Sequence, residues 1–165
     1  MKVLVIVGSA RPNSTANKLT SSVAKAFTNS EVTFYKPVNL PFFNEDIPPA
    51  MLGERMAYPD EEVQRFTKAV IEADLVVLLS PEYNHGLPAV LKNALDWVYR
   101  EWEKKPVYVI TYGVIGGPYS TQHLSDILAH LKVEVKGNMK ITLDEVNKEL
   151  AQVESALREA FLSIT

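Results

Sequence analysis

The chain has 165 residues, of which 47% are hydrophobic and 22% charged, and it carries 17 basic and 20 acidic side chains but no cysteine. The length and composition predict one domain with a substantial core, spanning residues 1–165. Without cysteine, a disulfide framework, a thiolate metal site and a cysteine nucleophile are all excluded. A formal net charge of −3 with no basic cluster argues against nucleic-acid binding.

The N-terminal apolar run, residues 3–7, is too short for the core of a signal peptide and far too short to span a bilayer. We therefore expect a cytoplasmic protein that does not act at a membrane. The same run is rich in β-branched residues, which predicts a strand buried on both faces. A helical stripe from Ala16 to Phe27 follows it, and three polar residues are available as the N-cap: Asn13, Ser14 and Thr15.

The rest of the chain continues this alternation. Residues 31–35 predict a second, shorter strand, and the proline-rich residues 36–58 predict a long loop that serves as a functional surface. Periodicity then predicts a helix at 63–73, a strand at 75–79, a helix at 87–98, a strand at 107–112, a helix at 124–131, a strand within 132–141 and one terminal helix at 143–161.

Strictly alternating strands and helices imply a parallel sheet with right-handed crossovers and helices on both faces. Five strands in this length predict an α/β chain with the three-layer α/β/α, flavodoxin-like fold and the strand order 2-1-3-4-5. In such sheets ligands bind outside the carboxyl ends of the strands, where the strand order reverses. The loops after the first, third and fourth strands are therefore the place to look for a site.

These three loops read GSARPNST (8–15), SPEYNHG (80–86) and YGVIGG (112–117), and they hold five of the seven glycines. The first loop leads into a helix N-terminus, which favours an anion. It adds three hydroxyls and a guanidinium suited to phosphate: Ser9, Ser14, Thr15 and Arg11. Because neither G-x-G-x-x-G nor a Walker A loop is present, we interpret it as a site for a terminal monophosphate such as that of FMN. The alternative is a helix cap beside an exposed arginine.

The second and third loops have features of a ring-binding surface. Tyr83 and Asn84 offer an aromatic face and an amide, between two stiffening residues, Pro81 and Pro88. Gly116 and Gly117 let the backbone approach a flat ligand closely. The alternatives are an ordinary turn with a packed tyrosine and a tight turn before a helix.

Taken together, these motifs resemble the NAD(P)H-dependent FMN reductase family of flavodoxin-like proteins, which includes quinone, azo-dye and chromate reductases. GSARPNST resembles the phosphate loop of the family, and SPEYNHGLPAVLKNALDW (80–97) is the more specific match. LPFFNEDIP (40–48) resembles the segment that follows the second strand in the family. The resemblance covers most of residues 1–131, and Pro118-Tyr119-Ser120 departs from it where many relatives carry an arginine.

The resemblance implies specific roles for ten residues. Ser9, Arg11, Ser14 and Thr15 would hold the FMN phosphate, and Gly116 and Gly117 would form the third flavin loop. Four consecutive residues would border the isoalloxazine ring: Pro81, Glu82, Tyr83 and Asn84. No side chain is expected to be catalytic in itself, because the cofactor carries the chemistry.

The expected activity is transfer of a hydride from NADPH or NADH to bound FMN and on to a quinone, an azo compound, free flavin or a metal oxyanion, by a ping-pong mechanism. An FMN electron carrier of the flavodoxin type is the main alternative, although a net charge of −3 lacks the strong acidity that carriers use for docking. A phosphate- or nucleotide-binding protein without redox activity is a third possibility.

The histidines and the aromatic residues after the second loop are expected to have structural roles and no catalytic role. His85 is interpreted as a surface or interface residue, and His123 and His130 lack the carboxylates that would complete a metal site, so no metal is expected. Trp97, Tyr99 and Trp102 indicate either core packing or a subunit contact. Because relatives form dimers or tetramers, we expect a homodimer or homotetramer that uses this helix and residues 36–58.

Overall fold

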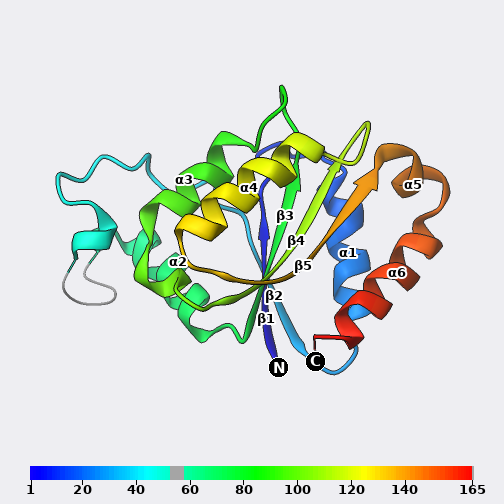
Figure 1. The fold of residues 1–165 in the computed structure, drawn as a ribbon, viewed down its shortest axis with the longest axis horizontal. Helices are drawn as coiled ribbons and strands as arrows, with labels where there is room; N and C mark the ends of the chain where they lie inside the picture. The colour runs from blue at the N-terminus through cyan, green and yellow to red at the C-terminus, as the bar shows by residue number, and fades with distance from the viewer. Residues whose placement is uncertain (53–57, 165) are drawn as a thin grey trace.

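The computed structural model describes residues 1–52 and 58–164. Its five strands form one parallel sheet in the order β2-β1-β3-β4-β5, so the predicted flavodoxin-like order is confirmed (Figure 1). The strands are β1 (Lys2–Val7), β2 (Glu31–Tyr35), β3 (Leu75–Pro81), β4 (Pro106–Gly113) and β5 (Glu134–Thr142). The central strands β1 and β3 are continuous apolar runs because both of their faces are covered.

Helices cover both faces of the sheet (Figure 1). One core cluster joins one face of the sheet to the helices α2 (Glu61–Glu72), α3 (Ala89–Trp97) and α4 (Pro118–His130). The other cluster joins the opposite face to α1 (Ala16–Ala26), α5 (Leu143–Lys148) and α6 (Leu150–Leu162). None of the helices in the described part of the chain has the length and apolar character that crossing a lipid bilayer requires.

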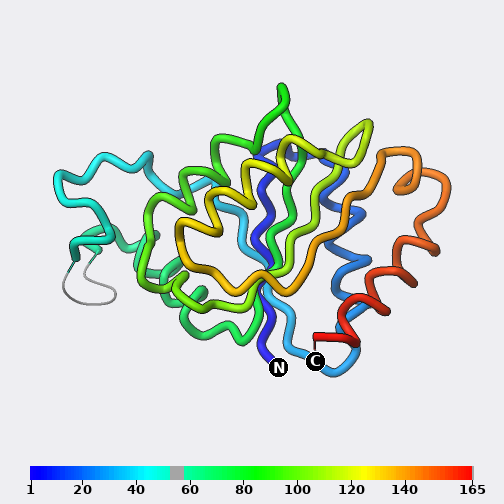
Figure 2. Tube along the Cα trace, in the orientation of Figure 1, coloured from blue at the N-terminus to red at the C-terminus, as the bar shows by residue number. Residues whose placement is uncertain are grey.

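The ends of the chain and the loops of interest lie at opposite edges of the sheet. Figure 2 shows both chain ends at the edge where the parallel strands begin. The loops after β1, β3 and β4 lie at the other edge, where the strands end (Figure 1). The carboxyl edge is therefore formed by these loops and the N-termini of α1, α3 and α4.

The segment after β2 is fixed against α3 by two polar side chains. Asn93 Nδ2 and Trp97 Nε1 donate to the carbonyl of Pro41, at 2.8 and 2.6 Å, and Asn93 Oδ1 accepts from the N–H of Phe43 at 2.9 Å. The predicted loop is interrupted by a short 3₁₀ helix, Pro49–Met51, and the part of that prediction that falls on 53–57 lies outside the described residues.

The structure corrects the predicted terminal helix and decides between the two roles left open for the tryptophans. The terminal helix is wrong as a single element, because the backbone leaves the helical conformation at Glu149 (φ −129°, ψ 30°) and separates α5 from α6. Of the two roles open to the aromatic residues after the second loop, the structure supports core packing for the tryptophans. Trp97 and Trp102 are 1% and 0% exposed, and Tyr99 is half-buried.

Candidate functional site

The first loop leaves the sheet at a closely packed glycine. Gly8 follows β1 and donates its N–H to the carbonyl of Leu79 in β3 at 2.8 Å. A Cβ at this position would lie 2.9 Å from Leu91 Cδ2 and 3.1 Å from the Leu79 oxygen. The loop is therefore seated directly on the neighbouring strand and helix before it turns into α1.

The N-terminus of α1 is open to an anion. Thr15 occupies the N-cap position, one of the three predicted, but its side chain makes no capping hydrogen bond, and the first turn holds no acidic residue. Ser14 Oγ is buried and has no hydrogen-bond partner among the described residues. Arg11 is exposed on the same loop. A helix N-terminus without a side-chain cap, a buried unpartnered hydroxyl and a nearby guanidinium together suit a phosphate group.

A cluster of hydroxyl groups links the first loop to the second. Ser9 Oγ lies 2.9 Å from the hydroxyl of Tyr83 and accepts the N–H of Arg11 at 3.3 Å. The hydroxyl of Tyr112, at the end of β4, is also buried here, and no described residue bonds it with good geometry. Burial, and then the nearby Tyr83, raise the Tyr112 pKa to about 12, against a smaller opposing effect of the Ser9 and Ser14 hydroxyls. Sequence reasoning missed Tyr112 as a member of this cluster.

The Tyr112 hydroxyl predicts a measurable alkaline effect. Since its folded pKa is about 12 and its ordinary value 10, this group adds stability below pH 10 that is lost as the pH rises from 10 to 12. At pH 11 the loss from Tyr112 alone should be about 1.4 kcal/mol. Tyr112→Phe should therefore lose about that much less free energy of unfolding between pH 8 and pH 11 than the parent chain, as measured by urea unfolding.

The comparison between the two proteins isolates Tyr112. Burial also raises the pKa values of Tyr35, Tyr58 and Tyr108, but their alkaline losses are common to both proteins and cancel in the difference. Equal losses in the two proteins would contradict a buried, uncharged Tyr112 hydroxyl.

The second loop is a closed two-residue turn. Tyr83 and Gly86 exchange N–H to carbonyl hydrogen bonds, both of 3.0 Å, around Asn84 and His85. Asn84 (φ 49°) and His85 (φ 59°) both adopt the left-handed conformation that such a tight turn requires. Their side chains are exposed, and Pro81 is buried at the end of β3. The turn holds its tip in one conformation at the edge of the site.

Glu82 ties the second loop to the third. Its carboxylate accepts the N–H groups of Tyr119 and Ser120 at 2.8 and 3.3 Å, and its own N–H donates to the Tyr112 carbonyl at 3.0 Å. The N-terminus of α4 is thus capped by a carboxylate of the chain itself. Glu82 was expected to border a ring, and the structure places its carboxylate at this helix end.

The third loop requires its two glycines. Gly116 (φ 84°) and Gly117 (φ 78°) are left-handed, and a Cβ on Gly117 would lie 3.1 Å from Thr111 Cβ and 3.3 Å from the Tyr112 nitrogen. Thr111 Oγ1 donates to the Gly116 carbonyl at 2.8 Å and lies 2.8 Å from Thr121 Oγ1. Thr111 is a second contributor that sequence reasoning missed, because its β4 position reads as an ordinary strand residue.

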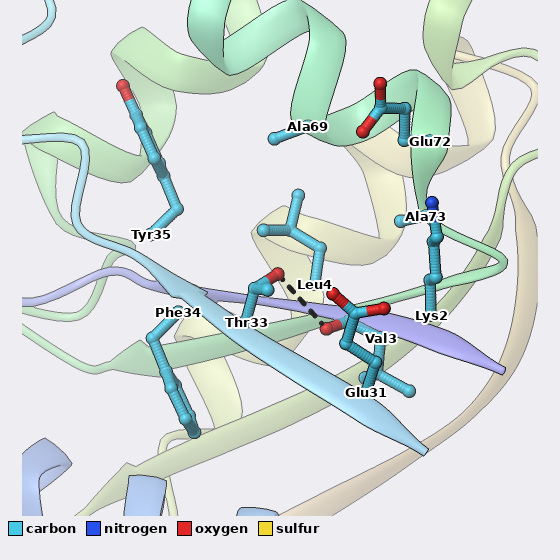
Figure 3. A pocket seen from close by; sticks show the side chains of 10 residues that line it. All are labelled: Lys2, Val3, Leu4, Glu31, Thr33, Phe34, Tyr35, Ala69, Glu72 and Ala73. Atoms are coloured by element: carbon cyan, nitrogen blue, oxygen red, sulfur yellow. Dashed lines mark hydrogen bonds between the residues drawn. The ribbon is translucent and has the colours of Figure 1, made fainter.

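The structure also contains a pocket away from the loops at the carboxyl edge. It has a volume of about 250 Å³ and lies along β2 and the C-terminal part of α2 (Figure 3). Its lining includes Lys2, Glu31, Glu72 and Tyr35, and Thr33 within it donates to the Val3 carbonyl. In the described ranges, no group of three or more metal-ligating side chains is placed to hold an ion.

Comparison with known proteins assigns the chain to a family. A model of the NADPH-dependent FMN reductases matches residues 1–148. The chain belongs to this family. A relative from Saccharomyces cerevisiae, an NAD(P)H-dependent FMN reductase, is 32% identical over 87% of this chain and 81% of its own length. A quinone reductase from Escherichia coli is 31% identical over 82% of this chain and 73% of its own length.

A solved structure extends the match in three dimensions. FerB, a flavoenzyme NAD(P)H:(acceptor) oxidoreductase from Paracoccus denitrificans, aligns with a TM-score of 0.73 and 26% identity over 98% of this chain and 97% of that chain. As a member of the NADPH-dependent FMN reductase family, the chain is an oxidoreductase that works with FMN and NAD(P)H. The open α1 N-terminus and the buried, unpartnered Ser14 hydroxyl fit the FMN phosphate.

Proposed function

We propose that residues 1–165 form one FMN-binding domain that passes reducing equivalents from NAD(P)H to a small-molecule acceptor at the carboxyl edge of the sheet. The observation that carries this proposal is the junction of an open, hydroxyl-rich helix N-terminus with two tightly held loops at the point where strand order reverses. The chemistry that FMN supplies when bound is transfer of a hydride out of NAD(P)H and its delivery, with a proton from water, to an acceptor such as a quinone.

The first loop is the proposed phosphate grip. Ser14 Oγ would donate a hydrogen bond to a phosphate at the N-terminus of α1, and Thr15 would add a hydroxyl. Arg11 adds the charge that a dianion requires. Ser9 fixes the conformation of the first loop through its contacts with the Tyr83 hydroxyl and the Arg11 N–H. It would therefore both position the phosphate-binding residues and line the phosphate site.

The other two loops are the proposed ring site. Pro81, Glu82, Tyr83 and Asn84 would border the ring on one side, and Gly116 and Gly117 would let the backbone approach it on the other. The Glu82 carboxylate acts by fixing Tyr119 and Ser120, and so holds the two loops at a constant separation. Backbone N–H groups of these loops would stabilise negative charge that develops on the ring during reduction.

Donor and acceptor are proposed to use this site in turn. The electron acceptors in view are quinones, azo compounds, free flavin and metal oxyanions, and a quinone reductase among the relatives supports the first class. A ping-pong reaction should give parallel initial-rate lines when NADPH and a quinone are varied together. Intersecting lines would show a ternary complex and contradict it.

One preparation separates the enzyme from its alternatives. After FMN is added and the unbound flavin is removed by desalting, the purified chain should be yellow, and anaerobic NADPH or NADH should bleach it. Comparing the two donors gives the nicotinamide preference. A yellow protein that neither donor bleaches would instead favour an electron carrier. A protein that is colourless once unbound FMN has been removed would contradict both flavin functions.

We also propose a cytoplasmic homodimer or homotetramer. The segment after β2 supports association, because Phe42 and Met51 are 77% and 74% exposed and Ile47 is exposed as well. The buried tryptophans of α3 and the following 3₁₀ helix (Arg100–Trp102) are excluded from that contact surface. Sedimentation equilibrium should give a mass above that of one chain, and a monomer at all concentrations would contradict association.

A further inference from the structure

Two exposed rings, one in the second loop and one in the first turn of α4, stack on each other. The imidazole of His85 and the ring of Tyr119 have centroids 4.1 Å apart and planes within 11° of parallel. Tyr119 is 44% exposed, and His85 is exposed at the tip of its turn. This pair, here called the aromatic platform, is a flat surface that faces solvent at the carboxyl edge.

Both rings of the platform are held from their backbones. His85 sits in the closed turn between Tyr83 and Gly86, and the Tyr119 N–H is bound by the Glu82 carboxylate at 2.8 Å. The turn lies beside His123: a Cβ at Gly86 would be at an ordinary contact distance, 3.5 Å, from His123 Nδ1. A platform ordered before binding loses little conformational entropy when a flat molecule stacks on it.

The platform lies beside the proposed ring site. His85 directly follows Tyr83 and Asn84, and Tyr119 comes two residues after Gly117. Figure 1 shows the loops after β3 and β4 rising side by side above the sheet. Val114 and Ile115, at the tip of the loop after β4, are 80% and 64% exposed and add apolar surface there. A molecule entering between these loops meets aromatic and apolar groups.

The charges of the two loops also favour an uncharged flat molecule over an anion. Residues 80–88 and 112–120 contain no lysine or arginine, and their one acidic residue is Glu82. Lys140 approaches from β5, where its Cβ lies near Gly116, and Arg11 belongs to the phosphate loop. An oxyanion therefore finds no cation within the two loops, whereas an electron-poor ring finds two rings to stack against.

We propose that the aromatic platform of His85 and Tyr119 selects flat, conjugated acceptors such as quinones over compact anions at this site. The proposal rests on the proposed function, because it assigns the acceptor preference of that same FMN site. In this proposal His85 binds the acceptor by stacking of its imidazole ring and does not transfer a proton. It also gives a role to Tyr119, which stands where the chain departs from the family pattern.

The first test is binding to the oxidised holoenzyme. The chain has three histidines, so the His85 imidazole protons can be assigned by NMR with single substitutions. Tyr119→Ala should move the His85 signals by removing the ring current of the stacked phenol. Titration with 2-methyl-1,4-naphthoquinone should shift the His85 signals and leave those of His130 in place, since His130 contacts Tyr99 at the opposite end of α4.

The second test isolates the acceptor half of the reaction. Holoenzyme reduced with dithionite is mixed anaerobically with the naphthoquinone or with ferricyanide, a compact anion without a flat ring. Tyr119→Ala and His85→Ala should each slow reoxidation by the naphthoquinone about tenfold, and Tyr119→Phe should stay within about twofold of the parent. Ferricyanide rates should not change, and His130→Ala, a matched loss of an exposed histidine, should behave as the parent with both acceptors.

Each outcome decides the proposal. An unchanged naphthoquinone rate in Tyr119→Ala, or an equal slowing with both acceptors, overturns the platform. His85 signals that do not respond to the naphthoquinone also overturn it. These results leave the proposed function intact so long as NAD(P)H bleaches the parent holoenzyme, whereas a parent chain that binds no FMN contradicts the proposed function and the platform with it.

Discussion

Replacing Arg11 with alanine is expected to weaken FMN binding by about 1.5–3 kcal/mol, or roughly 10- to 150-fold in Kd. The reason is the loss of a charge-assisted contact to the phosphate beside the open N-terminus of α1. Quenching of FMN fluorescence on titration with the apoprotein measures the change. Because Arg11 is exposed, a value near the lower limit is expected at high salt.

Two variants make the Arg11 result specific. Arg11→Lys keeps the charge but loses the planar fork, so its affinity should fall between those of the parent and the alanine variant. Arg65→Ala removes the same charge from α2, where Arg65 pairs with Glu62, and should leave FMN affinity unchanged. Equal losses in Arg11→Ala and Arg65→Ala would show that only net charge matters and would remove Arg11 from the proposed site.

Trp97→Ala is expected to lower the free energy of unfolding by about 3–5 kcal/mol. The indole is 1% exposed, packs edge-on against Phe43 with centroids 5.2 Å apart, and donates to the Pro41 carbonyl at 2.6 Å. Removing it empties a large volume between α3 and the segment after β2. Urea unfolding followed by circular dichroism measures the loss.

Trp97→Phe and protein concentration serve as the controls for that measurement. The phenylalanine variant keeps most of the packing, and the Pro41 carbonyl still accepts from Asn93, so its loss should be about 1 kcal/mol. If Trp97 acted at a subunit contact, the difference from the parent would vary with protein concentration. A core residue predicts the same difference at each concentration.

The architecture could be predicted because its signals are local. Buried strands such as β1 and β3 are marked by apolar runs, and polar loop residues follow each run. The sequence predicted β5 only as a strand somewhere within residues 132–141. An edge strand that is exposed along much of its length has little hydrophobic pattern from which its ends could be predicted. The break at Glu149 had no signal either, because the apolar spacing from Leu143 to Phe161 continues through it without a proline or glycine.

The location of the site could be predicted, but its internal contacts could not. The carboxyl edge follows from the strand order alone. The Ser9 to Tyr83 contact joins residues 74 positions apart, and the Glu82 contact with Tyr119 joins residues 37 apart. Such pairings depend on how neighbouring strands align, and no spacing in the sequence encodes them. For the same reason, Tyr112 and Thr111 could not be identified as parts of the site from a strand pattern.

The hydrogen bonds of Glu82 have a mechanical consequence for the molecule. By binding the first turn of α4, this carboxylate joins the start of the second loop to the helix that follows the third loop. A side-chain link from the second loop to the first is a neutral pair of hydroxyls, Ser9 and Tyr83. Such a bond contributes only about 1 kcal/mol. This link to the phosphate loop is therefore weaker than the charge-assisted bonds by which Glu82 joins the second loop to α4, and the stacked rings of His85 and Tyr119 lie on the more strongly joined side.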